Sequence, residues 1–338
     1  MHVAVDAHNL LTDRRGIGVY LRAVLREWYA AEACEVTALV RHPLPRLLQR
    51  RLSGEIGVPR VRIASRIPRD AGVVWHPWNG TFFEGGKRNV ATIHDVVPFA
   101  YPNPDPAKRA HEQQPFLRSA QRSDAIITDS AFSAGEIRVH LAVPPERITV
   151  VQLGVDDAFS PGLPADLPGG LQRERYVLYV GTFEERKNVP PLVAAWREAL
   201  QPRGVALAIV SRGPDVEDAT MLRGLSTTAL RDLYRGALAV ALPSVYEGFG
   251  LTALEALACG APLIASRASS LPEVASEAAR YVEVPASPGA WSAALREIAS
   301  DPALRDTLRA AGPARAQRFS WRRTAAEALH VLERVAAG

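Results

Sequence analysis

The sequence has 338 residues, of which 47% are hydrophobic and 22% are charged, as expected for two globular domains of ordinary size and not for a disordered chain. Its formal net charge is +4, and no apolar run reaches the roughly 20 residues that a membrane-spanning helix needs. The two cysteines, Cys34 and Cys259, match no metal-ligand spacing, which argues against a disulfide framework or a zinc knuckle. Because the first residues lack the sections of a signal peptide, we expect a cytoplasmic protein.

The first half alternates short apolar runs, typical of buried strands, with segments of helical period. The expected strands are residues 3–5, 36–40, 73–75, 90–93, 125–128 and 148–151, and the expected helices are residues 18–30 and 132–141. This alternation predicts crossover units and a parallel sheet.

A stretch rich in proline and glycine then predicts an interdomain linker over residues 158–175. A second series follows, with strands at 176–180, 205–210, 238–242 and 262–265 and helices at 190–200, 228–236 and 250–258. The stretch from about 290 to 335 is helical in period, with breaks near Asp301-Pro302 and Gly312-Pro313. We therefore expect an N-terminal domain over 1–157, a C-terminal domain over 176–315, and a last helix over 316–338. Open α/β sheets bind ligands at their carboxyl edges, so two such domains are expected to enclose a cleft.

Basic charge is concentrated between Arg41 and Arg69, where eight arginines accompany a single acid, Glu55. Two interpretations stay open: a solvated face, or peripheral contact with an anionic membrane or a phosphorylated acceptor. Nucleic acid is not expected as a partner, because no aromatic residue interleaves with these arginines as a stacking platform.

The most informative segment follows the expected strand 238–242 and contains Glu247, Gly248, Gly250 and Glu255. Glycines between a strand and a helix let the backbone approach a ligand, and the first turn of a helix offers unpaired N–H groups with a partial positive charge. A phosphate-bearing ligand suits such a place. Taken singly, either glutamate could instead be an exposed helix residue or an acid that answers the helix dipole.

Three further segments follow expected strands. Residues 181–188 read Gly-Thr-Phe-Glu-Glu-Arg-Lys-Asn, and the adjacent Arg186 and Lys187 could neutralise a diphosphate leaving group or could simply be solvated. Residues 93–98 place His94 at a strand end, where it is either an uncharged hydrogen-bonding group of a site or a satisfied core residue, while Asp95 either orients it or caps the next turn. Residues 13–18 lack the third glycine of a dinucleotide fingerprint, which argues against a nicotinamide site and leaves a simple tight turn open.

These segments together resemble the family-4 retaining glycosyltransferases of the GT-B fold, with a pattern similar to the mannosyltransferase-like group. The resemblance implies two facing doubly wound Rossmann-like domains with the donor site in the second. It also implies that the last helix, 316–338, returns to the first domain. The site residues that it implies are His94, Arg186, Lys187 and Glu247 as catalytic groups, and Gly16, Gly181, Thr182, Phe249, Gly250, Leu251, Thr252 and Glu255 as donor-binding groups.

In this resemblance Glu247 contacts the donor sugar and Glu255 the nucleotide ribose, while backbone amides at Gly250 and its neighbours hold the diphosphate. Thr252 stands where relatives often have proline, and Thr182 where many have arginine, so Arg186 would supply that charge. Residues 129–133 and 153–156 also match the family and are expected to be structural, with serines as helix caps.

The function implied is transfer of a sugar from a nucleoside-diphosphate sugar, with GDP-mannose favoured by the pattern, to an acceptor hydroxyl in glycan, glycolipid or metabolite biosynthesis. Cations and amides would stabilise the leaving group, so neither a metal nor a cofactor is expected. Two alternatives stay open. One is a GT-B fold epimerase that converts a sugar nucleotide without an acceptor, and the other is a non-catalytic binding partner that keeps the fold.

Overall fold

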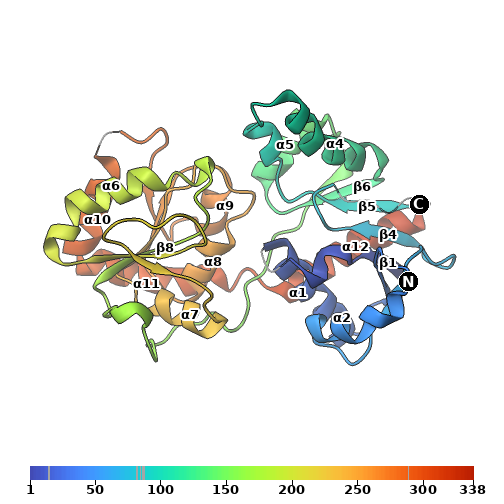
Figure 1. Ribbon diagram of the computed structural model, residues 1–338, viewed down its shortest axis with the longest axis horizontal. Helices are drawn as coiled ribbons and strands as arrows, with labels where there is room; N and C mark the ends of the chain where they lie inside the picture. The colour runs from blue at the N-terminus through green and yellow to red at the C-terminus, as the bar shows by residue number, and fades with distance from the viewer. Residues whose placement is uncertain (14–15, 81–82, 84, 86–87, 288) are drawn as a thin grey trace. The chain divides into compact units, whose positions relative to one another are not determined.

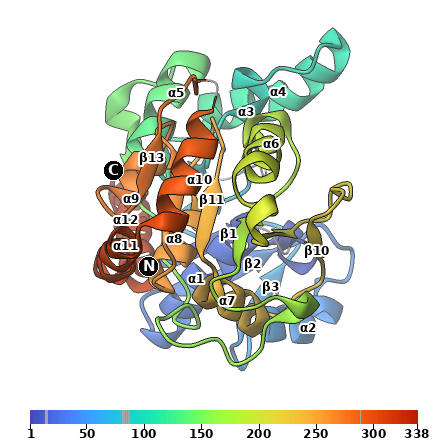
Figure 2. The same ribbon diagram turned by 90° about the vertical axis from the view of Figure 1, so that its left-hand side faces the viewer.

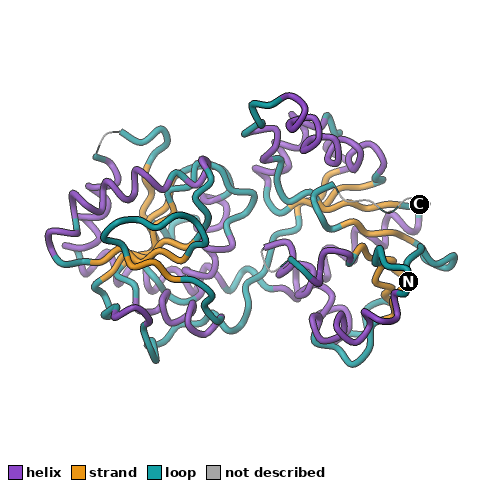
Figure 3. Tube along the Cα trace, viewed as in Figure 1, coloured by secondary structure: helices purple, strands orange, loops and turns teal. Residues whose placement is uncertain are grey.

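The computed structural model describes residues 1–13, 16–80, 83, 85, 88–287 and 289–338. The chain forms two compact units, one of Met1–Gly154 with Ser320–Gly338 and one of Val155–Phe319 (Figure 1). Each unit contains its own parallel sheet flanked by helices (Figure 3). Arg14 and Arg15, next to the predicted donor-binding residue Gly16, lie outside the described residues.

The first unit is built on a seven-stranded parallel sheet in the order β3-β2-β1-β4-β5-β6-β7. Its strands are β1 (His2–Asp6), β2 (Glu35–Leu39), β3 (Arg62–Ala64), β4 (Val73–His76), β5 (Asn89–Thr92), β6 (Ala125–Thr128) and β7 (Ile148–Val150). In the register, Val3 of β1 lies opposite Val36 on one side and Val73 on the other. The strand order therefore reverses between β1 and β4, the arrangement of a doubly wound sheet.

Helices of the first unit come from both ends of the chain. They are α1 (Gly16–Ala30), α2 (Gln49–Ile56), α3 (Val97–Ala100), α4 (Pro106–Arg122), α5 (Ala131–Leu141) and α12 (Trp321–Ala337), with short 3-10 turns η1 (His8–Leu11), η2 (Pro45–Leu48) and η3 (Pro145–Arg147). The C-terminal helix α12 packs against α1 (Figure 1). The indole of Trp28 donates a 2.8 Å hydrogen bond to the carbonyl of Ala325. A Cβ atom at Gly154 would lie 2.1 Å from the backbone nitrogen of Trp321, so the start of α12 requires glycine there.

The second unit has a six-stranded parallel sheet in the order β10-β9-β8-β11-β12-β13. The strands are β8 (Tyr176–Val180), β9 (Ala206–Val210), β10 (Thr220–Leu222), β11 (Ala239–Leu242), β12 (Leu263–Ser266) and β13 (Arg280–Val282). The helices are α6 (Val189–Ala199), α7 (Thr227–Gly236), α8 (Leu251–Ala258), α9 (Leu271–Ala275), α10 (Ala290–Ser300) and α11 (Pro302–Ala316), with 3-10 turns η4 (Pro168–Gly170), η5 (Glu185–Lys187) and η6 (Gln201–Arg203). Helix α6 packs against α10, and α8 packs against α11 (Figure 2).

The breaker-rich stretch 158–175, expected as a linker, is packed on the second unit. Arg235 of α7 donates from Nε to the carbonyl of Ser160 at 2.8 Å and from NH2 to its hydroxyl at 3.0 Å. The carboxylate of Asp232, in the same helix, accepts from the amide of Ala165 at 3.2 Å. Because α7 satisfies these backbone groups, proline and glycine here give an irregular but anchored segment.

Two features of the C-terminal half differ from expectation. The break expected at Gly312-Pro313 is wrong, since α11 continues to Ala316 and the chain turns only after it. A Cβ atom at Gly312 would lie 2.9 Å from the carbonyl oxygen of Leu257, so this glycine permits α11 to pack closely on α8 instead of ending the helix. The strands that the periodicity missed, β3, β10 and β13, each have three residues at a sheet edge, too short for a recognisable apolar run. Among the residues that the structure describes, none of the helices combines the length and the apolar character needed to cross a bilayer.

Candidate active site

Two loops of the second unit meet at the point where its strand order reverses. Strands β8 and β11 are neighbours, with Val177 opposite Ala239, but their chains continue to β9 and β12 on opposite sides. The loops that follow them therefore leave the same carboxyl edge of the sheet, at the position where doubly wound sheets bind ligands. The amide of Val245 donates to the carbonyl of Arg186 at 2.8 Å and ties the two loops together.

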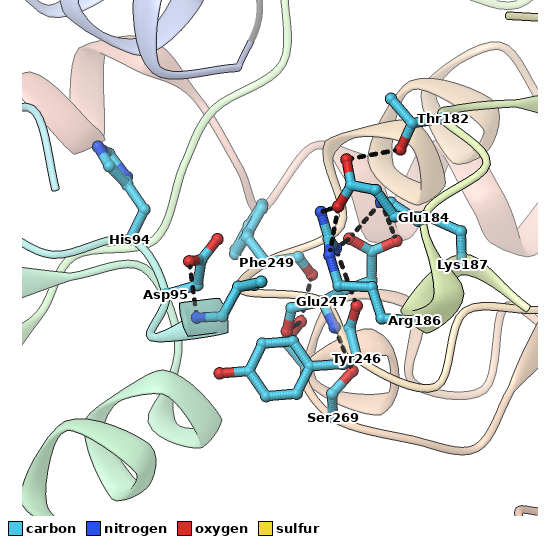
Figure 4. A network of polar contacts seen from close by, with 12 residues as sticks. His94, Asp95, Thr182, Glu184, Arg186, Lys187, Tyr246, Glu247, Phe249 and Ser269 are labelled. Atoms are coloured by element: carbon cyan, nitrogen blue, oxygen red, sulfur yellow. Dashed lines mark hydrogen bonds and ion pairs between the residues drawn. The ribbon is translucent and has the colours of Figure 1, made fainter. Parts of the chain in front are cut away.

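Lys187 and Glu247 form an ion pair across these loops. Nζ of Lys187 lies 2.7 Å from Oε1 and 2.8 Å from Oε2 of Glu247, so the ammonium group faces both carboxylate oxygens (Figure 4). A guanidinium nitrogen of Arg186 lies 3.6 Å from the same carboxylate. The side chains of Lys187 and Glu247 are 16% and 14% exposed, so the pair is shielded from water yet open enough for a ligand to reach.

Arg186 is held in place by a network of its own. Its Nε donates to Glu184 at 2.8 Å and its NH1 donates to the carbonyl of Tyr246 at 3.1 Å (Figure 4). The hydroxyl of Thr182 donates to the other oxygen of Glu184 at 2.9 Å. Partial burial by itself would raise the pKa of Glu184, but Arg186 and Thr182 hold it below its ordinary value. Thr182 thus orients the acid that orients Arg186.

The loop of Glu247 is also braced from the loop between β12 and α9. The hydroxyl of Ser269 accepts a 3.0 Å hydrogen bond from the amide of Glu247. The hydroxyl of Ser270 lies 2.9 Å from the carbonyl of Glu247 and 2.7 Å from that of Phe249, and donates to this pair of acceptors. Sequence reasoning did not identify these serines, although both follow an expected strand. They fix the backbone on either side of Gly248.

The start of α8 offers backbone N–H groups to an anion. Gly250, the residue before the helix, has φ of 109°, in the left-handed region that favours glycine. The first helical residue is Leu251, with Thr252 after it, and among the described residues no side chain caps this helix start. First-turn amides without an intrahelical partner carry a partial positive charge, so a phosphate group would be stabilised here.

Glu255 lies one turn further into α8 and is partly buried. The phenol of Tyr234, a fully buried residue of α7, donates to Oε2 of Glu255 at 2.8 Å. Burial raises the pKa of Glu255 to about 7, and the negative charge of Asp156 acts in the same direction, while the hydrogen bond from Tyr234 opposes them. Tyr234 was not identified from the sequence, because nothing in its spacing links it to Glu255.

The site residues predicted in the first unit are His94 and Gly16. His94 follows β5, and its Nδ1 lies 2.7 Å from the carboxylate of Asp129, which follows the neighbouring strand β6. The carboxylate of Asp95 accepts from the amide of Val97, the first residue of α3, at 3.2 Å (Figure 4). Asp129 is the acid that orients His94. Gly16 is the first described residue of α1.

The structure thus gathers most of the predicted residues at one edge of the second sheet. They lie in the two loops or in α8: Gly181, Thr182, Arg186, Lys187, Glu247, Phe249, Gly250, Leu251, Thr252 and Glu255.

A separate group, His2, Glu35 and Asp70, could reach one metal ion in the first unit. It lies at the amino-terminal edge of that sheet, and Arg62 already contacts both acids, which explains their grouping without an ion.

Comparison with known proteins identifies the family. The family model described as Glycosyltransferase Family 4 matches residues 14–159, and that described as Glycosyl transferases group 1 matches residues 169–315. The O-antigen chain mannosyltransferase B of Escherichia coli is 33% identical over 259 residues, which cover 70% of this chain and 67% of that protein. This chain belongs to glycosyltransferase family 4.

The family 4 glycosyltransferase is also similar to the MMP alpha-(1->4)-mannosyltransferase of Mycolicibacterium hassiacum, with 34% identity over 238 residues that cover 65% of this chain and 56% of that protein. The chain therefore aligns with between half and two thirds of the length of these relatives. Among solved structures, Anabaena Alr3699/HepE in complex with UDP and glucose matches with a TM-score of 0.74 at 14% identity, covering 98% of this chain and 99% of that one. This likeness agrees with the predicted GT-B fold.

Proposed function

We propose that this family 4 glycosyltransferase transfers a sugar from a nucleoside-diphosphate sugar to an acceptor hydroxyl, with retention of the anomeric configuration. The observation that supports it best is the pairing of Lys187 with Glu247 beside the uncapped start of α8. A sugar diphosphate needs cations and N–H groups at its phosphates and a hydrogen-bond acceptor at its sugar hydroxyls. This edge of the second sheet supplies all of them within a few residues.

In this proposal the second unit binds the donor. Lys187 and Arg186, with the amides of Gly250 and its neighbours, neutralise the charge that develops on the departing diphosphate. Glu247 accepts from hydroxyls of the donor sugar and Glu255 accepts from the ribose. Gly181, Thr182 and Thr252 complete the surroundings of the donor, and no metal ion is required for this charge balance.

The first donor to test is GDP-mannose. Two relatives that are more than 30% identical are named as mannosyltransferases, and the sequence pattern favours the same sugar. The Anabaena protein was solved with UDP and glucose, so UDP-glucose is the informative comparison.

Product analysis distinguishes a transferase from the two alternatives, an epimerase and a non-catalytic binding partner. The protein is incubated with GDP-mannose, with and without a set of saccharide, lipid-linked and small polyol acceptors, and the products are followed by NMR. We expect GDP and a new glycoside only when an acceptor is present, with a one-bond C1–H1 coupling typical of the α-anomer of the donor. Conversion of the sugar nucleotide alone would support an epimerase. No conversion of any donor, together with no nucleotide binding, would support a non-catalytic partner.

We also propose that the first unit contacts an anionic membrane. The segment after β2, which includes η2, carries Leu44 and Leu47, which are 62% and 70% exposed. Exposed arginines lie close to them in sequence, among them Arg46 and Arg50. Exposed leucines beside cationic side chains match the two parts of a lipid surface, the acyl boundary and the anionic headgroups.

A further inference from the structure

The imidazole of His94 has a hydrogen-bond acceptor at each of its nitrogens. Nδ1 lies 2.7 Å from Oδ2 of Asp129, and Nε2 lies 3.2 Å from the carbonyl oxygen of Pro77. The side chains of His94 and Asp129 are 8% and 3% exposed, so water does not compete for these contacts. A carbonyl oxygen can only accept, which places a hydrogen on Nε2.

The hydrogen shared with Asp129 belongs to His94, because an imidazole is a stronger base than a carboxylate. Burial raises the pKa of Asp129, while the charge and the hydrogen bond of His94 act against that rise. Both ring nitrogens then donate, and the ring is an imidazolium ion. Burial by itself would lower the pKa of His94, but the charge and hydrogen bond of Asp129 hold it above its ordinary value, with a smaller contribution from Asp95. This differs from the uncharged histidine that the sequence suggested.

A second buried histidine of the same sheet differs from His94 in its hydrogen-bond partners and in the direction of its pKa shift. His76, at the end of β4, has Nε2 3.1 Å from the side-chain oxygen of Asn89, and its Nδ1 accepts from the amide of Phe83 at 3.3 Å. One of its nitrogens donates and the other accepts, which is the pattern of a neutral ring. Burial lowers the pKa of His76 to about 4. With the carboxylate of Asp129 at one ring nitrogen, His94 instead has a pKa held above its ordinary value.

His94 is also fixed through its backbone. Its amide donates to the side chain of Asn79 at 2.7 Å, and its carbonyl accepts from the hydroxyl of Ser133 at 3.0 Å. The ring of Tyr20 in α1 meets the imidazole edge to face, with centroids 5.0 Å apart. Contacts from β6, α5 and α1 thus restrict the ring to one orientation at the carboxyl edge of the sheet.

We propose that Asp129 is a positioning residue that keeps His94 as a fixed cation. When the donor is bound, the Nε2–H group of His94 donates its hydrogen bond to an oxygen of the sugar diphosphate instead of to the carbonyl of Pro77. This rests on the proposed function. The charge of the imidazolium strengthens its hydrogen bond to an oxygen that gains negative charge as the glycosidic bond to phosphate breaks. Among the described residues, His94 is the one hydrogen-bond partner of the Asp129 carboxylate, so Asp129 acts through the ring.

The test is the protonation state of His94 in the wild-type protein, read from the nitrogen chemical shifts of its ring by two-dimensional NMR. The assignment comes from the spectrum of His94→Gln. We expect both ring nitrogens to be protonated at pH 7 and to titrate above the range of an exposed histidine. Asp129→Asn should move that titration to lower pH, while the signals of His76 stay those of a neutral ring. A neutral His94 at pH 7, or a titration that Asp129→Asn leaves unchanged, would overturn the proposal.

Kinetics give a second readout. Asp129→Asn should lower kcat at least tenfold at pH 8 and shift the alkaline limb of the kcat profile to lower pH, with the binding of GDP changed less than twofold. A purely structural role would lower the active fraction equally at every pH. If the wild-type protein transfers no sugar, the proposed function is wrong. The NMR titration still shows whether Asp129 keeps the imidazole of His94 protonated.

Discussion

Nζ of Lys187 lies 2.7 and 2.8 Å from the two carboxylate oxygens of Glu247, so in the free protein these two charges neutralise each other. Both groups are proposed to bind the donor, Lys187 at the phosphates and Glu247 at the sugar. A diphosphate must therefore draw the ammonium group away from its partner or share it. The carboxylate competes with the nucleotide for the same cation, which gives Glu247 opposite effects on nucleotide binding and on transfer.

Glu247→Gln should separate these effects. The amide keeps the shape of the side chain but removes the charge that competes for Lys187 and Arg186. We expect GDP to bind about 3- to 10-fold more tightly, the size of a partly exposed ion pair. Transfer should fall about 100-fold, because a charged acceptor at the sugar is lost. Calorimetric titration with GDP and a transfer assay measure the two quantities.

A suitable control is Glu217→Gln, which changes an acid whose side chain is 87% exposed and whose carboxylate lies 3.9 Å from Arg197. It should alter neither quantity. If GDP bound more weakly to Glu247→Gln than to the wild type, the proposed competition between carboxylate and nucleotide would be wrong.

Glu255 should make both stability and nucleotide binding depend on pH. Its pKa is raised by burial from 4.5 to about 7, so between these values the folded protein holds a proton that the unfolded chain has released. The free energy of unfolding should therefore fall as pH rises through this window, by up to about 3 kcal/mol, and stay lower above it. Denaturant unfolding of Glu255→Gln should lack this decline, and at pH 8 this variant should be the more stable protein.

The same titration should affect GDP binding. An ionised carboxylate accepts hydrogen bonds from the ribose better than a protonated one, so binding should tighten as pH rises through about 7. The titration of GDP itself is common to all variants, so the difference from Glu255→Gln isolates the effect of the carboxyl group. Tyr234→Phe, which removes the donor to Glu255 and keeps the aromatic ring, should move the midpoint to higher pH. An unchanged midpoint would contradict the role assigned to the 2.8 Å hydrogen bond.

Residues that act within a local segment could be predicted from the sequence, and residues that act through contacts between distant segments could not. Lys187, Glu247 and Gly250 were identified because each follows a strand in a segment of recognisable local chemistry. Both parallel sheets were predicted from apolar runs that alternate with helical periods, and the strands that were missed are three-residue edge strands. The doubly wound order was implied by the family resemblance.

The missed residues act through tertiary contacts. Tyr234 reaches Glu255 from another helix, and Asp129 reaches His94 from a neighbouring strand. Ser269 supports Glu247 from a third loop. Their residue types are common and their spacing has no period, so only the fold brings them together. Gly312 was misjudged for the same reason, because close helix packing and a helix break both favour glycine.

The membrane proposal predicts a salt-sensitive interaction of the first unit. The wild-type protein should sediment with vesicles that contain anionic phospholipid and not with neutral ones, and binding should weaken as salt is raised. Replacing Leu44 and Leu47 together by serine should reduce binding about tenfold or more through lost apolar contact. Val139→Ser is the matched control, since Val139 is 75% exposed on α5 of the same unit. Equal binding to neutral and anionic vesicles would refute the charge complementarity.

Removal of divalent metal should leave transfer intact. The proposal assigns the charge of the leaving diphosphate to Lys187, Arg186 and the amides at the start of α8, which function without an ion. Rates measured in EDTA and in excess magnesium should agree within about twofold. Activity that disappears in EDTA and returns with magnesium or manganese would show that these groups do not suffice.

Isothermal titration of GDP and UDP tests most directly whether the second unit binds a nucleoside diphosphate through Lys187. We expect at least one of them to bind the wild-type protein, with Lys187→Ala raising its Kd about 10- to 100-fold through loss of a charged contact. Lys108→Ala, which changes an exposed lysine of α4, should bind like the wild type. Absence of nucleotide binding, or equal affinity for wild type and Lys187→Ala, would contradict the account.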